Sequence, residues 1–259
     1  MVEQIAERRK AEEHCERGAT YADQGRWNEA VRELQAALCL NPDYALAHYN
    51  LGVLYTQQGL LDKAVAEFKA TLRTSPNFVE AHKQLGVAYA LQGRADDALD
   101  VWKVALRIIP NDADLRYNLG RVLLTEGRLE EAIREFRAAS RMNPEYAEAH
   151  YQLGLCYWQQ DRMDMAERAW HSTLRINQNH ANAHDSLGLV YANQGHLEKA
   201  AAQFRAAVRI NPDHAGAHYN LGATYYNQGL LPQALGELQR AAELGSQDAW
   251  NLLAQLGLV

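Results

Sequence analysis

The hexapeptide AHYNLG occurs at residues 47–52 and again, letter for letter, at residues 217–222. The two copies lie a whole number of 34-residue steps apart, and a glycine marks the same place in every step. Seven glycines share this spacing: Gly18, Gly52, Gly86, Gly120, Gly154, Gly188 and Gly222. A fixed period of this length indicates a chain built from repeated structural units, each presenting the same packing faces to its neighbours.

A common set of residues surrounds each glycine. In the second unit the set is Leu51, Tyr55, Gly59, Ala64, Phe68 and Pro76, and in the third it is Leu85, Tyr89, Gly93, Ala98, Trp102 and Pro110. This L-G-x-x-Y, A-x-x-x-F and proline spacing resembles that of the tetratricopeptide repeat (TPR) family, and the resemblance covers about residues 11–248. It implies an all-α fold, a right-handed α-solenoid superhelix of seven 34-residue helix-turn-helix repeats.

The resemblance divides the chain into an extension, seven repeats and a cap. Residues 1–10 are expected to form an N-terminal helical extension, and residues 249–259 a C-terminal capping helix. The repeats are expected at residues 11–44, 45–78, 79–112, 113–146, 147–180, 181–214 and 215–248. One helix pair of this size cannot bury its apolar face alone, so we expect stacking on neighbouring repeats to supply the stability.

The residues between repeats also favour helix pairs. Five second helices are expected to end before a proline, because proline cannot donate the helical hydrogen bond: Pro42, Pro76, Pro110, Pro144 and Pro212. An Asp or Asn soon afterwards is expected to cap the following first helix, in the repeats that carry Asp43, Asn77, Asn111, Asn179 and Asp213.

Composition argues against several classes of protein. The net charge of -6 is spread over segments of mixed sign, so no basic stripe favours a nucleic-acid partner. No apolar run approaches the length of a membrane span, and the first residues do not resemble a secretory signal, so we expect no membrane partner and a cytoplasmic location. Three cysteines without a C-x-x-C spacing do not suggest a disulfide framework.

The first helix of each repeat keeps one face free of the packing pattern. At about 100° per residue, Ala47, Leu51 and Leu54 share the packed side, whereas Tyr49 and Asn50 fall on the remaining arc. In the TPR family the first helices line the concave surface, so the resemblance places this arc on the wall of a peptide-binding groove. The candidate groove residues are Tyr49, Asn50, Gln57, Lys83, Gln84, Tyr117, Asn118, Arg121, Tyr151, Gln152, Trp158, Gln159, Asn193, Tyr219, Asn220, Tyr226 and Asn227.

The chemistry of these side chains fits an extended peptide. A side-chain amide carries a donor and an acceptor, so it can pair with the backbone of a ligand without reading its sequence. Tyr and Trp add contact area at low entropic cost. The inner amides look similar to those in the TPR domain of O-linked N-acetylglucosamine transferase, where asparagines hold extended substrate chains. The alternative is a solvated surface without a ligand, but the recurrence of Tyr at one position in four repeats favours the groove.

A second binding mode of the family, the carboxylate clamp of chaperone cochaperones, does not fit. Lys83 and Asn118 match two clamp positions, but Val87, Glu148 and Gln152 stand where Asn, Lys and Arg are needed. Lys83, Arg116 and Arg121 form the cationic cluster of this face, which either meets an acidic group of a ligand or is solvated.

The histidines recur as regularly as the glycines. His14, His48, His82, His150, His184 and His218 stand four residues before the repeat glycine, too far apart on stacked helices to share a metal. We expect them to pack between repeats. The pairs His180/His184 and His214/His218 have helical spacing but lack a third ligand, so no metal is expected. No motif for nucleophilic, phosphate or paired-carboxylate chemistry is present, so neither catalysis nor a cofactor is expected.

Two functions follow as hypotheses. The first is a protein-protein interaction adaptor or scaffold that binds an extended or disordered segment of a partner in its concave groove. The alternative is a structural subunit of a larger, stable complex that docks through the convex second helices or the terminal caps. The apolar end LLAQLGLV, residues 252–259, offers a contact of the second kind.

Overall fold

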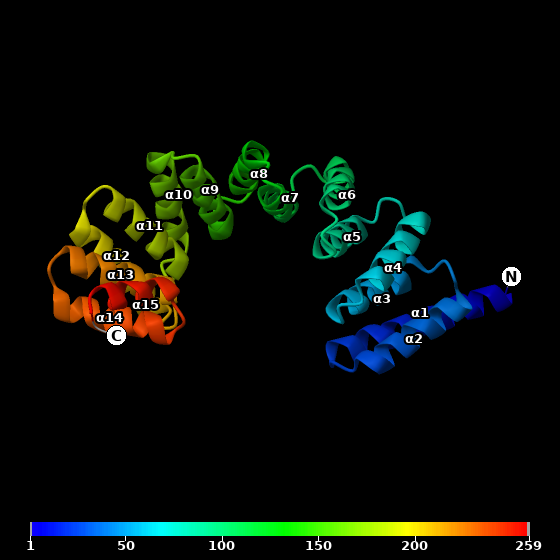
Figure 1. Ribbon diagram of the computed structural model, residues 1–259. Coiled ribbons are helices and arrows are strands. Elements are labelled where there is room, and N and C mark those ends of the chain that lie inside the picture. Colours follow the sequence, from blue (N-terminus) through cyan, green and yellow to red (C-terminus); the bar gives the residue numbers. More distant parts are fainter. Residues whose placement is uncertain (1, 258–259) are drawn as a thin grey trace. The chain divides into compact units, whose positions relative to one another are not determined.

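The computed structural model describes residues 2–257, and within this range it contains fifteen α-helices and no strand (Figure 1). The prediction of an all-α fold of helix-turn-helix repeats is confirmed. The chain forms two compact units, one up to Arg128 and one from Leu129 onward. This boundary lies inside the expected fourth repeat, so its two helices belong to different units. The handedness of the superhelix stays a prediction.

Helix bounds follow the expected period closely. The helices described in the first unit are α1 Val2–Asp23, α2 Trp27–Leu40, α3 Ala45–Gln57, α4 Leu61–Thr74, α5 Val79–Leu91, α6 Ala95–Ile108 and α7 Ala113–Thr125. Those described in the second are α8 Leu129–Met142, α9 Ala147–Gln159, α10 Met163–Ile176, α11 Ala181–Asn193, α12 Leu197–Ile210, α13 Ala215–Asn227, α14 Leu231–Glu243 and α15 Gln247–Gln255. From α3 to α13, every first helix begins at the first residue of an expected repeat.

Each helix pair that lies within one unit is held by a close contact between the repeat glycine and a large side chain of the second helix. A Cβ atom on Gly52 would lie 2.6 Å from Cε1 of Phe68, and one on Gly188 would lie 2.5 Å from Cε1 of Phe204. Both phenylalanines are buried. Because glycine has no side chain, the two helices can approach closely, and the aromatic ring covers the backbone of the first helix.

Tryptophan takes the place of phenylalanine in two repeats and adds a hydrogen bond. The ring of Trp102 lies where a Cβ atom on Gly86 would be, and its Nε1–H donates to the backbone oxygen of Lys83 at 3.0 Å. Trp170 lies against Gly154 in the same way, and its Nε1–H donates to the backbone oxygen of Tyr151 at 3.3 Å. The bond satisfies the polar atom that burial of an indole would otherwise leave unpaired.

A left-handed residue joins the two helices of most repeats. In the described turns this residue is glycine, with φ between 71° and 75° at Gly25, Gly59, Gly93, Gly127, Gly195 and Gly229. The fifth repeat has Asp161 at this place, with φ of 58°. A side chain in the left-handed region costs free energy that glycine avoids, so this turn is strained relative to the others.

The expected helix caps are wrong by one position. Tyr44 and Phe78 directly precede α3 and α5, and neither caps the helix with its side chain. Asp112 caps α7 by accepting the Leu115 N–H, a role the sequence had given to Asn111. The extended residue that ends each linker comes later than the Asp or Asn, because the linker first makes a tight turn.

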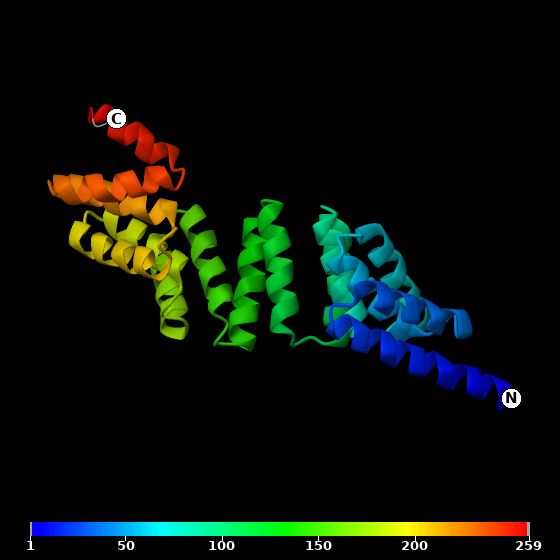
Figure 2. The same cartoon turned by 90° about the horizontal axis from the view of Figure 1, so that it is seen from below.

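The two ends differ from the internal repeats. The expected extension is continuous with the first helix of repeat one, since α1 runs unbroken from Val2 to Asp23. The capping helix α15 follows α14 at the C-terminal end (Figure 2). It begins after Ser246, whose Oγ accepts the Ala249 N–H, and it packs on α14 through Ala249 and Leu253. Residues 258–259 of the expected cap lie outside the described residues. Within residues 2–257, no helix has the length and apolar character needed to cross a bilayer.

The glycine contact predicts opposite effects of one substitution at two sites. Gly188→Ala should lower the free energy of unfolding by about 1–3 kcal/mol, because the new methyl group overlaps Phe204. Gly236→Ala, in the middle of α14 with no atom within 4 Å of the new Cβ, should raise it by about 0.5–1 kcal/mol. Urea titrations followed by circular dichroism measure both. Equal effects of the two variants would show that the close contact does not matter.

The strained turn gives a second prediction. Asp161→Gly should raise the free energy of unfolding by about 0.5–1 kcal/mol, because glycine adopts the left-handed conformation without strain. The reverse change at the equivalent turn, Gly195→Asp, should lower it by a similar amount. Thermal melts of both variants test the pair, and a loss of stability in Asp161→Gly would contradict the account.

Candidate peptide-binding face of the first helices

Two positions on each first helix face the neighbouring repeat as well as the expected groove. The first inner position holds Cys15, Tyr49, Lys83, Tyr117, Tyr151, Asp185 and Tyr219. The second inner position, one residue later, holds Glu16, Asn50, Gln84, Asn118, Gln152, Ser186 and Asn220. Most of these side chains are half-buried. Their contacts decide which of them remain available to a ligand.

Side chains at the first inner position contact the residue just before the next first helix. The rings of Tyr49 and Phe78 lie 5.0 Å apart. Lys83 Nζ forms an ion pair with Asp112 Oδ2 at 2.7 Å. Aromatic residues thus meet aromatic residues, and a cation meets an anion. The tyrosines expected on an open groove wall therefore take part in joining one repeat to the next.

Side chains at the second inner position bond back to the preceding repeat. Asn50 Nδ2 donates to Cys15 Sγ at 3.6 Å, and Asn220 Nδ2 donates to Asp185 Oδ1 at 3.0 Å. Each bond joins the second inner position of one repeat to the first inner position of the repeat before it. These two amides are therefore not fully available to a ligand, because each donates one N–H to a side chain of the preceding repeat.

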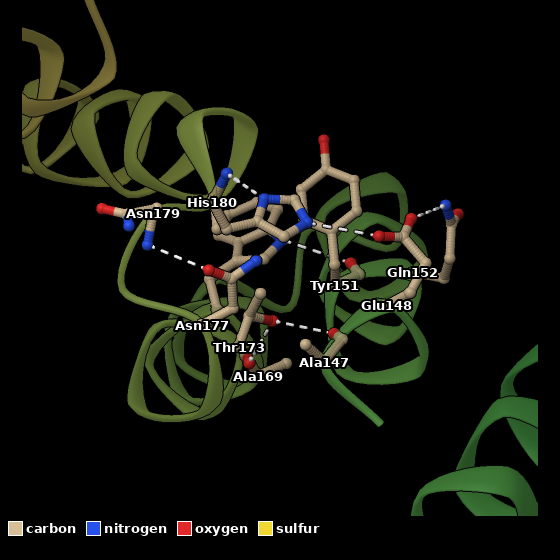
Figure 3. A network of polar contacts seen from close by, with 11 residues as sticks. Ala147, Glu148, Tyr151, Gln152, Ala169, Thr173, Asn177, Asn179 and His180 are labelled. Atoms are coloured by element: carbon tan, nitrogen blue, oxygen red, sulfur yellow. Dashed lines mark hydrogen bonds and ion pairs between the residues drawn. The ribbon is translucent and has the colours of Figure 1, made fainter. Parts of the chain in front are cut away.

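The inner residues of the fifth repeat take part in a network of polar contacts (Figure 3). The ring of Tyr151 lies against that of His180, with centroids 4.7 Å apart, and burial raises the pKa of Tyr151. Glu148 accepts from His180 Nε2 at 3.2 Å and from Gln152 Nε2 at 3.1 Å. Tyr151 and Gln152 are thus committed to contacts within the protein.

Gln84 and Asn118 differ from these residues. In the part of the chain that the structure describes, neither side chain forms a hydrogen bond. The reason is visible in the neighbours. The residue 35 positions before Asn118 is Lys83, whose ammonium donates to Asp112 rather than to Asn118. Gln84 follows Tyr49, whose ring is packed on Phe78. Both amides keep their full capacity for a ligand.

Asn118 borders a hollow of about 240 Å³ between α5 and α7. The hollow is lined by Val87, Ala90, Leu91, Trp102, Asn118, Arg121, Val122 and Thr125. Arg121 is exposed, and its guanidinium lies 6.0 Å from the centre of the Tyr117 ring. Leu91, which the sequence analysis missed, is 61% exposed. Leu91 occupies the repeat position that holds Gln57 and Gln159 in other repeats. An apolar residue at that position was the signal that could have revealed it.

An equivalent hollow of about 190 Å³ lies two repeats earlier, between α1 and α3. It is lined by Ala19, Ala22, Asp23, Trp27, Leu34, Asn50, Val53, Leu54 and Gln57. Asn50 corresponds here to Asn118, and Gln57 to Thr125. The hollow is therefore a recurrent product of the way two first helices pack over a second helix, and its lining is set by the residues of each repeat.

The remaining candidate residues fall into two groups. Exposed amides end four first helices, at Gln57, Gln159, Asn193 and Asn227. The aromatic residues are more varied. Trp158 is half-buried with its ring 6.0 Å from that of Trp170, and Tyr219 packs on the cluster formed by α14 and α15. Tyr226 is 39% exposed and borders a separate apolar hollow at the C-terminal end.

The regular histidines bond helices together. His48 Nδ1 lies 2.6 Å from Glu67 Oε2 in the second helix of its repeat, and Nε2 lies 2.9 Å from the backbone oxygen of Pro42. His218 makes the same two contacts, with Glu237 and Pro212. A histidine at this position thus joins the two helices of its own repeat and bonds to the linker before them. The expectation of packing between repeats is refined accordingly.

Histidines of the two spaced pairs serve as helix caps. Nδ1 of His180 accepts the Ala183 N–H, and Nδ1 of His214 accepts the Ala217 N–H, each at 3.1 Å. Nε2 of His214 faces Asn182 Oδ1 at 3.1 Å. Among residues 2–257, no three His, Cys, Asp or Glu side chains come together in a manner suited to a metal ion.

Sequence comparison now identifies the family. A model of the cilia and flagella-associated protein 70 C-terminal domain, a TPR domain, matches residues 44–255, and a model of the TPR repeat matches residues 18–59. The chain belongs to the tetratricopeptide repeat family. None of the curated proteins matches it significantly. TPR domains are modules for protein-protein interaction, and proteins of this family bind protein or peptide partners.

Solved TPR structures are similar to this chain. The crystal structure of MamA is 29% identical with a TM-score of 0.59, over 64% of this chain and 96% of that one. YrrB, described as a TPR protein with an unusual peptide-binding site, is 27% identical with a TM-score of 0.59, over 71% and 95%. PilF of Pseudomonas aeruginosa is 20% identical with a TM-score of 0.71, over 82% and 97%, and shows the fold alone.

Asp185 gives a prediction of pH dependence within this TPR domain. Burial raises the pKa of its carboxyl group, so ionisation opposes folding, and this cost is complete above the raised pKa and disappears as the pH falls through it. Asp185→Asn keeps an acceptor for Asn220 but removes the charge. The variant should therefore be more stable than the wild type at pH 7 and equally stable below about pH 4.

Urea titrations between pH 3.5 and pH 8 measure this difference. Asp114→Asn, at an exposed position on α7, serves as the control and should change stability by no more than about 0.5 kcal/mol. A Asp185→Asn variant that is less stable than the wild type at pH 7 would show that the ionised carboxylate stabilises the fold.

Proposed function

We propose that this TPR protein is an adaptor or scaffold that binds an extended segment of a partner protein along the free face of its first helices. The sequence-based expectations of a cytoplasmic location and of an absence of catalysis belong to the same proposal. The partner is a protein or peptide, rather than a nucleic acid or a membrane. An extended segment suits the face because its backbone offers N–H and C=O groups at regular intervals.

The observation that carries the proposal is the pair of uncommitted amides. Gln84 and Asn118 occupy the same position in consecutive repeats, and Asn118 borders the hollow between α5 and α7. Each amide can donate to a ligand carbonyl and accept from a ligand N–H. A ligand that pairs with both amides gains affinity from each hydrogen bond.

Similarity to YrrB supports the proposal. That protein has a peptide-binding site and covers most of this chain at 27% identity. The comparison supports peptide binding as the kind of function, whereas the residues involved follow from the contacts described above. The proposal narrows the groove expected along repeats two to seven to α5 and α7, because the inner side chains described above for the other repeats bond or pack within the protein.

A second candidate function rests on the C-terminal end of the domain. Tyr226, Leu231, Pro232, Ala234, Leu235 and Leu256 line an apolar hollow there of about 640 Å³. Leu231 is 57% exposed. An uncharged surface of this kind favours docking in a stable complex. This site would make the protein a structural subunit, with or without a peptide on its first helices.

Removal of the two free amides tests the adaptor function. The double variant Gln84→Ala/Asn118→Ala should lose the partners that the wild-type domain captures from cell lysate, because binding loses up to four hydrogen bonds. Each bond contributes about 0.5–1.5 kcal/mol, so affinity should fall by at least about tenfold. Quantitative mass spectrometry of the captured proteins provides the measurement, and circular dichroism confirms that the fold is retained.

The control removes two amides from second helices. Gln35 and Gln239 are exposed on α2 and α14, and the variant Gln35→Ala/Gln239→Ala should capture the same partners as the wild type. Capture that is unchanged in the Gln84/Asn118 variant but lost in Leu231→Glu would reject the adaptor function and assign binding to the C-terminal hollow.

A further inference from the structure

We propose that the hollow between α5 and α7 selects segments that carry an apolar side chain next to a carboxylate group. This inference rests on the proposed function and adds the chemistry of the partner. It goes beyond backbone pairing, since the amides of Gln84 and Asn118 hold an extended chain of any sequence. Selectivity has to come from the other residues that line the hollow.

The wall of the hollow is apolar and incompletely covered. Val87, Ala90 and Leu91 come from α5, Val122 comes from α7, and Trp102 of the second helix α6 forms the floor. Leu91 and the hollow itself are open to solvent, and a volume of about 240 Å³ accommodates one Leu or Phe side chain. An apolar cavity of about 150 Å³ already holds a benzene ring. Burial of such a side chain is favourable by about 1.5–3 kcal/mol.

The charge at the hollow is positive. Arg121 lines the hollow, and within the described residues its guanidinium lies over the face of the Tyr117 ring rather than beside a carboxylate. Of the other two cations of this face, Lys83 is neutralised by Asp112 at 2.7 Å, and Arg116 does not line the hollow. Asp114 is exposed on the same helix as Arg121 but does not line the hollow. Arg121 is thus the cation placed to pair with a ligand carboxylate.

The equivalent hollow between α1 and α3 shows what makes this one selective. Val53 stands there in the place of Arg121, and Asp23 in the place of Leu91. Its lining therefore contains an anion and no cation. The packing geometry recurs along the domain, but the combination of an exposed leucine, a free amide and an unpaired guanidinium occurs at α5 and α7. The hollow between α1 and α3 therefore repels a segment with an acidic group, and the hollow between α5 and α7 attracts it.

The carboxylate can come from two sources, an Asp or Glu side chain or the C-terminus of the segment. Both offer the guanidinium a planar pair of oxygens. The partner would run past Asn118, with its apolar side chain in the hollow and its carboxylate on Arg121, one helical turn further along α7. Arg121 adds specificity here, while Gln84 and Asn118 hold the backbone.

Selection from a displayed library of random 16-residue segments tests the inference. Two formats are used, one with a free C-terminus and one with the segment embedded between constant flanks. Segments enriched on the wild-type domain should combine a Leu, Ile, Met or Phe with a carboxylate, and the two formats show which source of carboxylate is used. Arg121→Glu should lower the affinity of an enriched segment by about tenfold, because an ion pair becomes a repulsion.

The matched control is Arg107→Glu, the same change of charge at an exposed residue of the second helix α6. It should leave affinity unchanged, and Arg121→Lys should retain most of it. Enriched segments that lack carboxylates, or that bind Arg121→Glu as tightly as the wild type, overturn this inference. The Gln84→Ala/Asn118→Ala variant then decides the proposed function: segments that require the amides leave it standing, whereas segments that ignore them, or a library without binders, overturn both.

Discussion

Within each unit, the fold depends on the contact between one glycine and one large side chain in every helix pair. Where Gly52 meets Phe68 and Gly154 meets Trp170, the absence of a Cβ atom lets the two helices of a repeat approach until a ring covers the backbone. This spacing brings the second helix under two successive first helices, as Trp102 under α5 and α7 shows. The hollows on the first-helix face are a direct consequence, because two successive first helices that pack over the same second helix leave space between them.

The contacts that join repeats decide where binding can occur. An inner side chain that finds a partner in the next repeat stabilises the stack, and one that does not is left for a ligand. Asn220 donates to the carboxylate of Asp185, whereas Lys83, at the equivalent place before Asn118, directs its ammonium to Asp112 instead. The same position thus serves stacking in one repeat and recognition in another, according to a residue that lies 35 positions earlier.

Much of the architecture could be predicted from sequence, because the glycines fix the period and the prolines mark the linkers. From α3 to α13, the first helices begin where the 34-residue frames predict. The caps could not be placed, since whether Asn111 or Asp112 precedes α7 depends on the turn that the linker makes. The face of Tyr49 was also misjudged. A wheel drawn for one helix leaves this side open, but Phe78 of the next repeat covers it.

Photo-crosslinking of a bound segment tests the central claim, that a partner lies on the first helices at α5 and α7, most directly. A benzoylphenylalanine replaces Leu91 at the hollow or Val104, which is exposed on the second helix α6. With a segment enriched on the wild-type domain, the account predicts a crosslink from position 91 and none from position 104. A crosslink from position 104 alone would place the partner on the second helices and contradict the account.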